Sequence, residues 1–179
     1  MRDVPTLTTE RFTLRPLRRS DAAALFSTLS DHEQCLYLTR PAFESEDELW
    51  GWLSAPDWPG RTWIAEDAQG EVAGRFVAFP APQPGVEEIG YIVCSHRQGE
   101  GIASECSRAL TTHLFALPVE QGGARKIIAE VDTRNTASVR LLESLGFTQE
   151  GHLREYEETH IGLCDVYWYG LLARDWPAA

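Results

Sequence analysis

HRQGEGIASE, residues 96–105, joins two segments of different pattern. The segment before it, VEEIGYIVCS (86–95), is an apolar run typical of a strand, whereas IASECSRALTTHLF (102–115) places apolar residues four apart on one helical face. Its two glycines, Gly99 and Gly101, allow backbone N–H groups to converge without side chains between them. The helix that follows adds partial positive charge, so this turn is suited to holding a phosphate group.

The known phosphate-binding patterns can be tested against this turn. A Walker motif is excluded because no Lys-Ser/Thr pair follows the glycines. The dinucleotide pattern G-x-G-x-x-G also fails, because Ser104 stands where its third glycine would be. A short G-x-G match also occurs in plain turns whose glycines only relieve backbone strain. The turn by itself therefore indicates a phosphate site without naming the ligand.

The rest of the sequence alternates between strand and helix patterns. The predicted strands span residues 7–17, 61–67, 71–79, 86–95, 125–132, 148–157 and 164–172, and the predicted helices span 20–31, 45–53, 102–115 and 135–147. Ser20, Ser45 and Asn135 are predicted N-caps, Ser45 forms a capping box with Glu48, and Gly146 ends the last helix. The central order of strand, turn, helix and strand predicts a parallel pair joined by a right-handed crossover, with antiparallel flanks. The fold class is therefore mixed α/β.

The composition is that of a globular protein, with 43% apolar and 24% charged residues in a chain of 179. This length predicts a single domain, residues 1–179. Acidic residues exceed basic ones by 11, which disfavours nucleic-acid binding and favours cationic ligands such as amines, although solubility alone would explain the same balance. No segment has the apolar length of a membrane span, and the N-terminus lacks the apolar core of an export signal.

Cysteine and histidine usage gives no sign of a metal site or a disulfide framework. The cysteines lie far apart without a CxxC pair, at Cys35, Cys94, Cys106 and Cys164. They are predicted to be reduced thiols. The five histidines show no metal-ligand spacing, and none stands out as a catalytic base. With no export signal, this pattern predicts a cytoplasmic protein without a bound metal.

Two motifs resemble those of the Gcn5-related N-acetyltransferase (GNAT) superfamily. QGEGIA (98–103) matches its pyrophosphate-binding pattern Q/R-x-x-G-x-G/A, and VDTRNTASVRLLESLGF (131–147) matches its second hallmark. The residues that carry the second motif are Asn135, Ser138, Leu142, Glu143, Gly146 and Phe147. The opening LTTERFTLRPLRRSDAAALF (7–26) and the closing GHLREY (151–156) and DVYWYGLLARDW (165–176) resemble one branch, the bacterial enzymes that acetylate N-termini of ribosomal proteins. The resemblance covers nearly the whole chain.

The resemblance implies a GNAT fold: one central, mostly antiparallel sheet of about seven strands with a splayed parallel pair, and about four helices. It also implies acetyl-CoA as the cofactor. The turn would hold the pyrophosphate, the free edge of the strand before it would pair with the pantetheine arm, and Asn135 would reach that arm unless it is only an N-cap. The implied cofactor-binding residues are Ile92, Val93, Cys94, Gln98, Gly99, Glu100, Gly101, Ile102, Ala103, Ser104, Asn135 and Ser138.

The implied reaction is attack of an amine on the thioester carbonyl of acetyl-CoA, after which the thiolate leaves. Ser138 is the implied general acid for the departing sulfur. Glu157 and Glu88 are the candidates for the general base, and a chain of water molecules is the third. Either carboxyl group needs a pKa raised by burial to act near neutral pH. An ordinary structural or surface role is the alternative for each of these side chains.

The sequence does not identify the acceptor amine, which is either a protein N-terminus or a small molecule. Trp50 and Trp52 are predicted to contact it, because aromatic faces can hold an amine or a peptide. Trp63 lies in a strand pattern and fits core packing at least as well. The oligomeric state is open, although relatives are often homodimers. Two other functions also stay open: a CoA-binding regulatory module without turnover, and a nucleotide-binding protein that uses the same turn.

Overall fold

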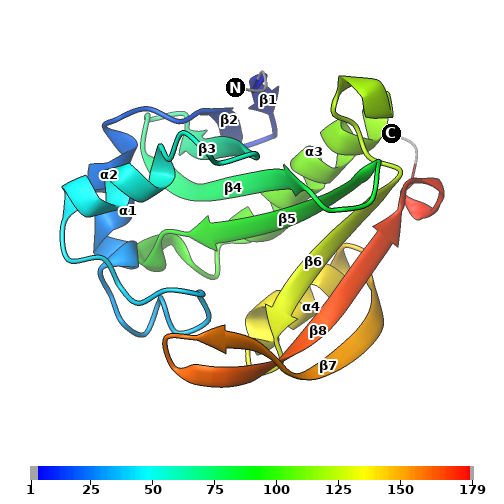
Figure 1. Cartoon of the computed structure of the whole chain (residues 1–179). Helices are drawn as coiled ribbons and strands as arrows, with labels where there is room; N and C mark the ends of the chain where they lie inside the picture. Colours follow the sequence, from blue (N-terminus) through cyan, green and yellow to red (C-terminus); the bar gives the residue numbers. More distant parts are fainter. Residues whose placement is uncertain (1–3, 178–179) are drawn as a thin grey trace.

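The computed structural model describes residues 4–177, and this part of the chain forms one eight-stranded sheet (Figure 1). The strands are β1 (Leu7–Thr8), β2 (Phe12–Pro16), β3 (Arg61–Asp67), β4 (Val72–Pro80), β5 (Val86–Val93), β6 (Lys126–Asp132), β7 (Thr148–Thr159) and β8 (Gly162–Leu172). Their order across the sheet is β1-β2-β3-β4-β5-β6-β8-β7. Every neighbouring pair is antiparallel except β5 and β6, which are parallel.

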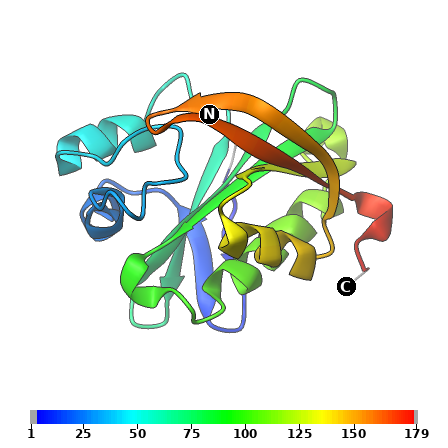
Figure 2. The same ribbon diagram turned by 90° about the horizontal axis from the view of Figure 1, so that it is seen from below.

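Helices cover both faces of the sheet, as Figure 2 shows from below. They are α1 (Asp21–Leu29), α2 (Glu46–Leu53), α3 (Ile102–Ala116) and α4 (Thr136–Ser144), with short 3-10 turns at Ser95–Arg97, Val119–Gln121 and Ala173–Asp175. The α3/α4 face is the side of the sheet that packs with Ile102, Leu110 and Leu142. The α1/α2 face is the side that packs with Leu25 and Leu49. Within residues 4–177, no helix is both long enough and apolar enough to cross a membrane.

The predicted mixed α/β fold with a mostly antiparallel sheet and four helices is confirmed, but the strand count is eight instead of about seven. The difference lies in the predicted strand 7–17, which is two strands, β1 and β2. Thr9 closes a turn between them: its amide donates to Phe12 O at 2.9 Å, and its hydroxyl accepts from the Phe12 amide at 2.9 Å. Neither glycine nor proline marks this turn, so the usual turn residues do not reveal it in the sequence.

The predicted helix starts are only partly formed as expected. Ser45 accepts from the Glu48 amide at 3.2 Å, which confirms the N-cap of α2. The Glu48 carboxylate, however, accepts from the amide of Glu44 and not of Ser45, so the capping box is completed one residue earlier. Ser20 precedes α1 but makes no side-chain cap bond, and its backbone is already helical.

The parallel pair β5 and β6 is joined over a short length only. Pairing runs from Val86 with Lys126 to Glu88 with Ile128, whereas β5 stays paired with β4 as far as Val93. The two strands then diverge, as Figure 1 shows. Residues 89–93 therefore have one edge without a neighbouring strand within the described chain. This divergence matches the splayed parallel pair that the family resemblance implies.

Candidate active site

The glycine turn between β5 and α3 has an open backbone. Gly99 and Gly101 have φ values of 82° and 78°, a left-handed conformation that favours glycine. A Cβ atom at Gly99 would meet nothing within 4 Å, so the space beside the turn is free. Because no side chain caps α3, the first amides of the helix, those of Ile102, Ala103 and Ser104, stay available. Gly101 and Ser104 also border a groove of about 830 Å³ between the N-terminal strands and α3.

Two carboxylates near this turn are neutralised by arginines. Glu100 accepts from Arg97 Nε at 3.1 Å, and Glu105 accepts from Arg11 Nε at 2.7 Å and from the Thr9 hydroxyl at 2.7 Å. Arg11 also donates from Nη2 to the backbone carbonyl of Glu100 at 3.0 Å, which ties the N-terminal hairpin to the turn. Acidic side chains therefore do not prevent the turn from holding a diphosphate.

Of the three residues predicted to pair with the pantetheine arm, Ile92 and Val93 lie on β5 and Cys94 does not. Cys94 lies past the end of the strand, and its amide donates to Ala73 of β4. The backbone groups of Ile92, two residues earlier, face β4 in the same way, so Val93 is the one of the three predicted residues whose backbone groups face the free edge. Gln98 ends the following 3-10 turn, and its Nε2 donates to Gln34 Oε1 at 2.8 Å and lies 3.5 Å from Val93 O. The open edge thus leads directly into the glycine turn.

The second motif places α4 beside this edge. Asn135 Oδ1 accepts from the Ser138 amide at 3.1 Å, so Asn135 is the N-cap, while its Nδ2 has no hydrogen-bond partner among residues 4–177. The Ser138 side chain lies close enough to Tyr91 to influence its ionisation, and burial raises the pKa of Tyr91 to about 12. Tyr169 donates to Glu143 Oε1 at 3.2 Å and thereby fixes α4 on the sheet.

Three carboxylates lie together on the opposite side of the sheet. Ile89 and Ala129 pack on the α3/α4 face, so their neighbours Glu88 and Glu130 project from the α1/α2 face. Burial raises the pKa of Glu88 to about 7, and the charges of Glu130 and Glu157 add to this shift. Burial also raises the pKa of Glu130 and of Glu157. Both predicted base candidates are therefore near each other, together with a third carboxylate.

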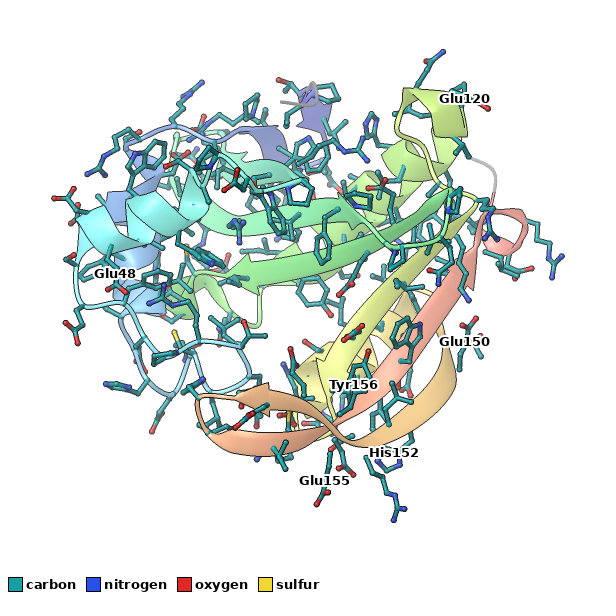
Figure 3. The ribbon with its side chains drawn as sticks, viewed as in Figure 1. Glu48, Glu120, Glu150, His152, Glu155 and Tyr156 are labelled. Atoms are coloured by element: carbon teal, nitrogen blue, oxygen red, sulfur yellow. The ribbon has the colours of Figure 1, made fainter. Side chains whose placement is uncertain are left out.

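A bulge in β7 positions Glu157. The register between β7 and β8 shifts between Leu153 and Glu157, and Glu155 within this stretch has a φ of 48°. Asp165 of β8 accepts from the Glu155 amide at 2.9 Å and contacts His152 Nε2 at 2.9 Å. These two bonds lower the pKa of Asp165. His152 and Glu155 point away from the sheet in Figure 3.

The predicted acceptor residues Trp50 and Trp52 are not brought together. Two residues apart on one helix, they point to different sides of α2. The Trp52 ring lies 4.5 Å from the Arg75 guanidinium, over the sheet, whereas Trp50 lies 5.4 Å from that of Arg19, just before α1. Trp63 is fully buried in the core on the α3/α4 face, as the alternative interpretation expects. Only Trp52 of this pair therefore lies over the strands.

Two residues of this region were missed in the sequence, Tyr91 and Glu130. The spacing in IGYIV could have placed Tyr91 on the face that α4 covers, two residues from Ile89. The signal for Glu130 is a charged side chain inside the apolar strand KIIAEVD, since carboxylates are rarely buried without a role.

A family model described as an acetyltransferase (GNAT) domain matches residues 11–148. The chain belongs to the GNAT acetyltransferase family. It is 34% identical over 178 residues to the uncharacterized N-acetyltransferase p20 of Bacillus licheniformis, covering 96% of this chain and 98% of that protein. The spermidine N-acetyltransferase of Vibrio cholerae, solved with CoA and spermine, has a TM-score of 0.77 and 25% identity and covers 92% of this chain and 96% of its own. Mycobacterium smegmatis RimJ with CoA-disulfide has a TM-score of 0.82 and covers 98% and 90%, but at 24% identity it shows the fold alone.

The predicted cofactor of this GNAT enzyme, acetyl-CoA, is confirmed by the family and by the CoA-bound neighbour. The residues present fit it. The glycines leave room beside the turn, the first amides of α3 are uncapped, and β5 has an unpaired edge. An N-acetyltransferase needs these features to hold a diphosphate and an extended arm.

Proposed function

We propose that this enzyme transfers the acetyl group of acetyl-CoA directly to a primary amine while both substrates are bound. The observation that carries the proposal is the free edge of β5, which has Ser138 of α4 on one face of the sheet and Glu88 on the other. Two reactants that meet at this edge lie between a proton donor and a proton acceptor. Correct placement of two reactants can lower a barrier by about 7–11 kcal/mol.

The chain offers a group for each part of the cofactor. The amides of residues 98–103 and the Ser104 hydroxyl are suited to the pyrophosphate, because they surround the start of α3. The edge at Val93 is suited to the amide groups of pantetheine. The unpaired Nδ2 of Asn135 can donate to the same arm. Acetyl-CoA itself supplies the activated acetyl group.

Glu88 has the stronger support as the general base. Its pKa of about 7 allows it to accept a proton near neutral pH, and it projects from the face opposite α4. The pKa of Glu157 is also raised, by burial and by the charge of Asp132, so Glu157 stays a second candidate. Glu130 acts here through its charge, which favours the protonated form of Glu88 and attracts an ammonium group.

Ser138 is the proposed proton donor to the leaving sulfur. A serine hydroxyl is a weak acid and needs a partner that orients it. The nearby half-buried Tyr91 supports this role, because Tyr91 is itself on β5 beside the free edge.

The acceptor is a small-molecule amine or a protein N-terminus. The spermidine N-acetyltransferase neighbour with bound spermine supports a small amine, whereas the resemblance to the ribosomal-protein branch supports an N-terminus. We also propose that the chain acts as one acetyltransferase domain, as its single sheet suggests, and that it works in the cytoplasm, which its four free buried cysteines fit. A homodimer is compatible with the proposal and is not required by it.

The test is thiol release from acetyl-CoA by the purified protein with peptides, diamines and amino acids as acceptors. Mass spectrometry should find an acetylated amine among the products. Binding of CoA without thiol release for any amine would favour a regulatory CoA-binding module instead. Stronger stabilisation by NAD or ATP than by CoA in thermal unfolding would favour a nucleotide-binding protein.

A variant pair tests the cofactor site separately. Gly101→Glu puts bulk and negative charge beside the proposed diphosphate site and should abolish CoA binding in calorimetry. Gly70→Glu is the matched control, since Gly70 also has a positive φ, 84°, but lies in the turn between β3 and β4, where a Cβ atom would meet nothing within 4 Å. Equal CoA affinity of the two variants would contradict the cofactor site.

A further inference from the structure

Arg75 of β4 differs from the other buried arginines in its partners. Arg15 forms a buried ion pair with Asp21, and Arg61 forms one with Glu87. Arg75 makes no ion pair with any carboxylate of the described chain, although acidic residues exceed basic ones by 11. Isolated buried charges cost several kcal/mol, so proteins usually pair them. An unpaired arginine in such an acidic chain indicates that its partner is a ligand.

The atoms of the Arg75 guanidinium show where this ligand can bind. The residue is 7% exposed, and Nη2 makes its one hydrogen bond, to the Thr62 hydroxyl at 3.4 Å. Nε is enclosed and has no partner; Nη1 has no hydrogen bond either, but it is not enclosed. Trp52 covers one side of the group, with 4.5 Å between the guanidinium carbon and the ring centroid. Burial lowers the pKa of Arg75 to about 10, so it is still a cation at neutral pH.

Arg75 and Glu88 share one face of the sheet. Arg75 lies opposite Ile64 and Ile92, which both pack with α1 and α2. Phe79, four residues further along β4, lies opposite Glu88. At the backbone the two positions are about 13 Å apart along the strands, and the two side chains extend over part of that distance. The α1/α2 face thus has a cation beside the free edge of β5 and a group of carboxylates further along it.

We propose that Arg75 binds a carboxylate of the acceptor, so that the acceptor is an amino acid or a similar amine that also carries an acid group. This inference rests on the proposed function, and it narrows the acceptor class. The ammonium group is attracted by Glu88, Glu130 and Glu157, and the carboxylate by Nη1 and Nη2 of Arg75. A diamine would instead bring a second cation towards Arg75, which like-charge repulsion disfavours.

The experiment compares acceptors in matched sets. Each set contains an amino acid, its carboxamide and the diamine of the same length, beginning with α-amino acids and extending to longer ω-amino acids. The measurement is kcat/KM for the acceptor at saturating acetyl-CoA. We expect the acid to exceed its carboxamide by at least about tenfold in the set whose spacing fits, because a charge-assisted hydrogen bond is lost in the amide. Equal values in every set, or a preference for the diamine, would overturn the proposal.

Variants assign the preference to Arg75. In Arg75→Gln the KM for the amino acid should rise until its kcat/KM no longer exceeds that of the carboxamide. The kcat/KM for the carboxamide should stay unchanged. Arg75→Lys keeps the charge and should keep part of the preference; it also decides the question if the glutamine variant does not fold. Arg174→Gln is the control, since Arg174 is 80% exposed and its loss changes net charge equally. An undiminished preference in Arg75→Gln would refute the assignment.

A binding measurement separates this inference from the proposed function. Calorimetry with N-acetyl amino acids and the CoA-loaded protein needs no turnover. If no amine is acetylated, the proposed function fails, but binding of the N-acetyl amino acid to the wild type and not to Arg75→Gln still supports the anion site. If amines are acetylated and N-acetyl amino acids bind both proteins equally, the proposed function stands and the role of Arg75 is wrong.

Discussion

Burial and the charges of Glu130 and Glu157 raise the pKa of Glu88 to about 7, far above the ordinary glutamate value near 4. Because the folded-state pKa is the higher one, folding takes up a proton between these two values. The stability that Glu88 contributes is therefore greatest at acidic pH and is lost as pH rises from about 4 to about 7. The same ionisation creates the proton acceptor that the proposed reaction needs, so activity and stability should change in opposite directions.

Glu88→Gln removes this ionisation with little change in size. Above pH 7 the variant should be more stable than the wild type, by up to about 3 kcal/mol, and the difference should vanish near pH 4. Its turnover should fall by about 100-fold or more, without the rise through pH 7 expected of the wild type. Urea unfolding and pH–rate profiles check the two effects. If Glu88→Gln keeps the pH–rate profile of the wild type, the general base is Glu157 or a water molecule instead.

Ser138→Ala tests the proton donor on the other face. Turnover should fall by about 10- to 100-fold, with the CoA dissociation constant almost unchanged, because the hydroxyl is needed as the sulfur leaves. Ser144→Ala on the same helix is the matched control: Ser144 is exposed, and its hydroxyl donates to the Leu141 carbonyl. Steady-state kinetics with calorimetry measures both quantities. If the two variants turn over equally fast, Ser138 has no part in the chemistry.

At the scale of elements, local patterns predict most of the fold. The glycine turn and the Asn135 cap each depend on a few consecutive residues, and both form as predicted. The break between β1 and β2 could not be predicted, because Thr9 closes it without a glycine or proline. The bulge around Glu155 could not be predicted either, since it depends on Asp165 of the neighbouring strand.

The residues of the candidate site also divide into those that local patterns indicate and those that depend on contacts between distant strands. The motif residues could be proposed from the sequence because their spacing along the chain is fixed by one turn and one helix. The group of Glu88, Glu130 and Glu157 was found only in part, because it joins three strands that are far apart in sequence. Arg75 was missed for a different reason: what distinguishes it is the absence of a partner in the described structure, which no sequence pattern records.

The β7 bulge gives a prediction at the same scale. Asp165→Ala removes the acceptor for the Glu155 amide and for His152, so Glu155 should leave its left-handed conformation. We expect a lower unfolding temperature and a lower kcat, since Glu157 moves with the bulge, whereas CoA affinity should not change. Glu158→Ala, an exposed position on the same strand, is the control. Unaltered kcat in Asp165→Ala would show that the bulge does not serve the site.

At the scale of the whole molecule, one buried ion pair joins the helical layer to the sheet. Arg15 of β2 donates to both Asp21 oxygens at 2.9 Å and to Glu66 of β3 at 2.6 Å. Asp21 is the first residue of α1, and α1 packs against α2. This cluster therefore sets how the layer that holds Trp52 sits over the strands.

Arg15→Gln leaves Asp21 buried without its partner. The free energy of unfolding should fall by about 3–5 kcal/mol, because an uncompensated buried charge stays behind. The double variant Arg15→Met with Asp21→Leu should recover most of this loss. Guanidinium unfolding of the three proteins measures the differences. A single variant as stable as the wild type would show that the pair does not hold the layers together.

Because β5 diverges from β6, residues 89–93 have one backbone edge with no neighbouring strand in the described chain. The extended pantetheine arm of acetyl-CoA, bound along that edge, would pair with β5 as a neighbouring strand does. A ligand at 100 times its dissociation constant adds about 2.7 kcal/mol to the free energy of unfolding. Proteases in the cell act on opened chains, so the supply of this metabolite would govern how long each copy survives as well as how fast it works.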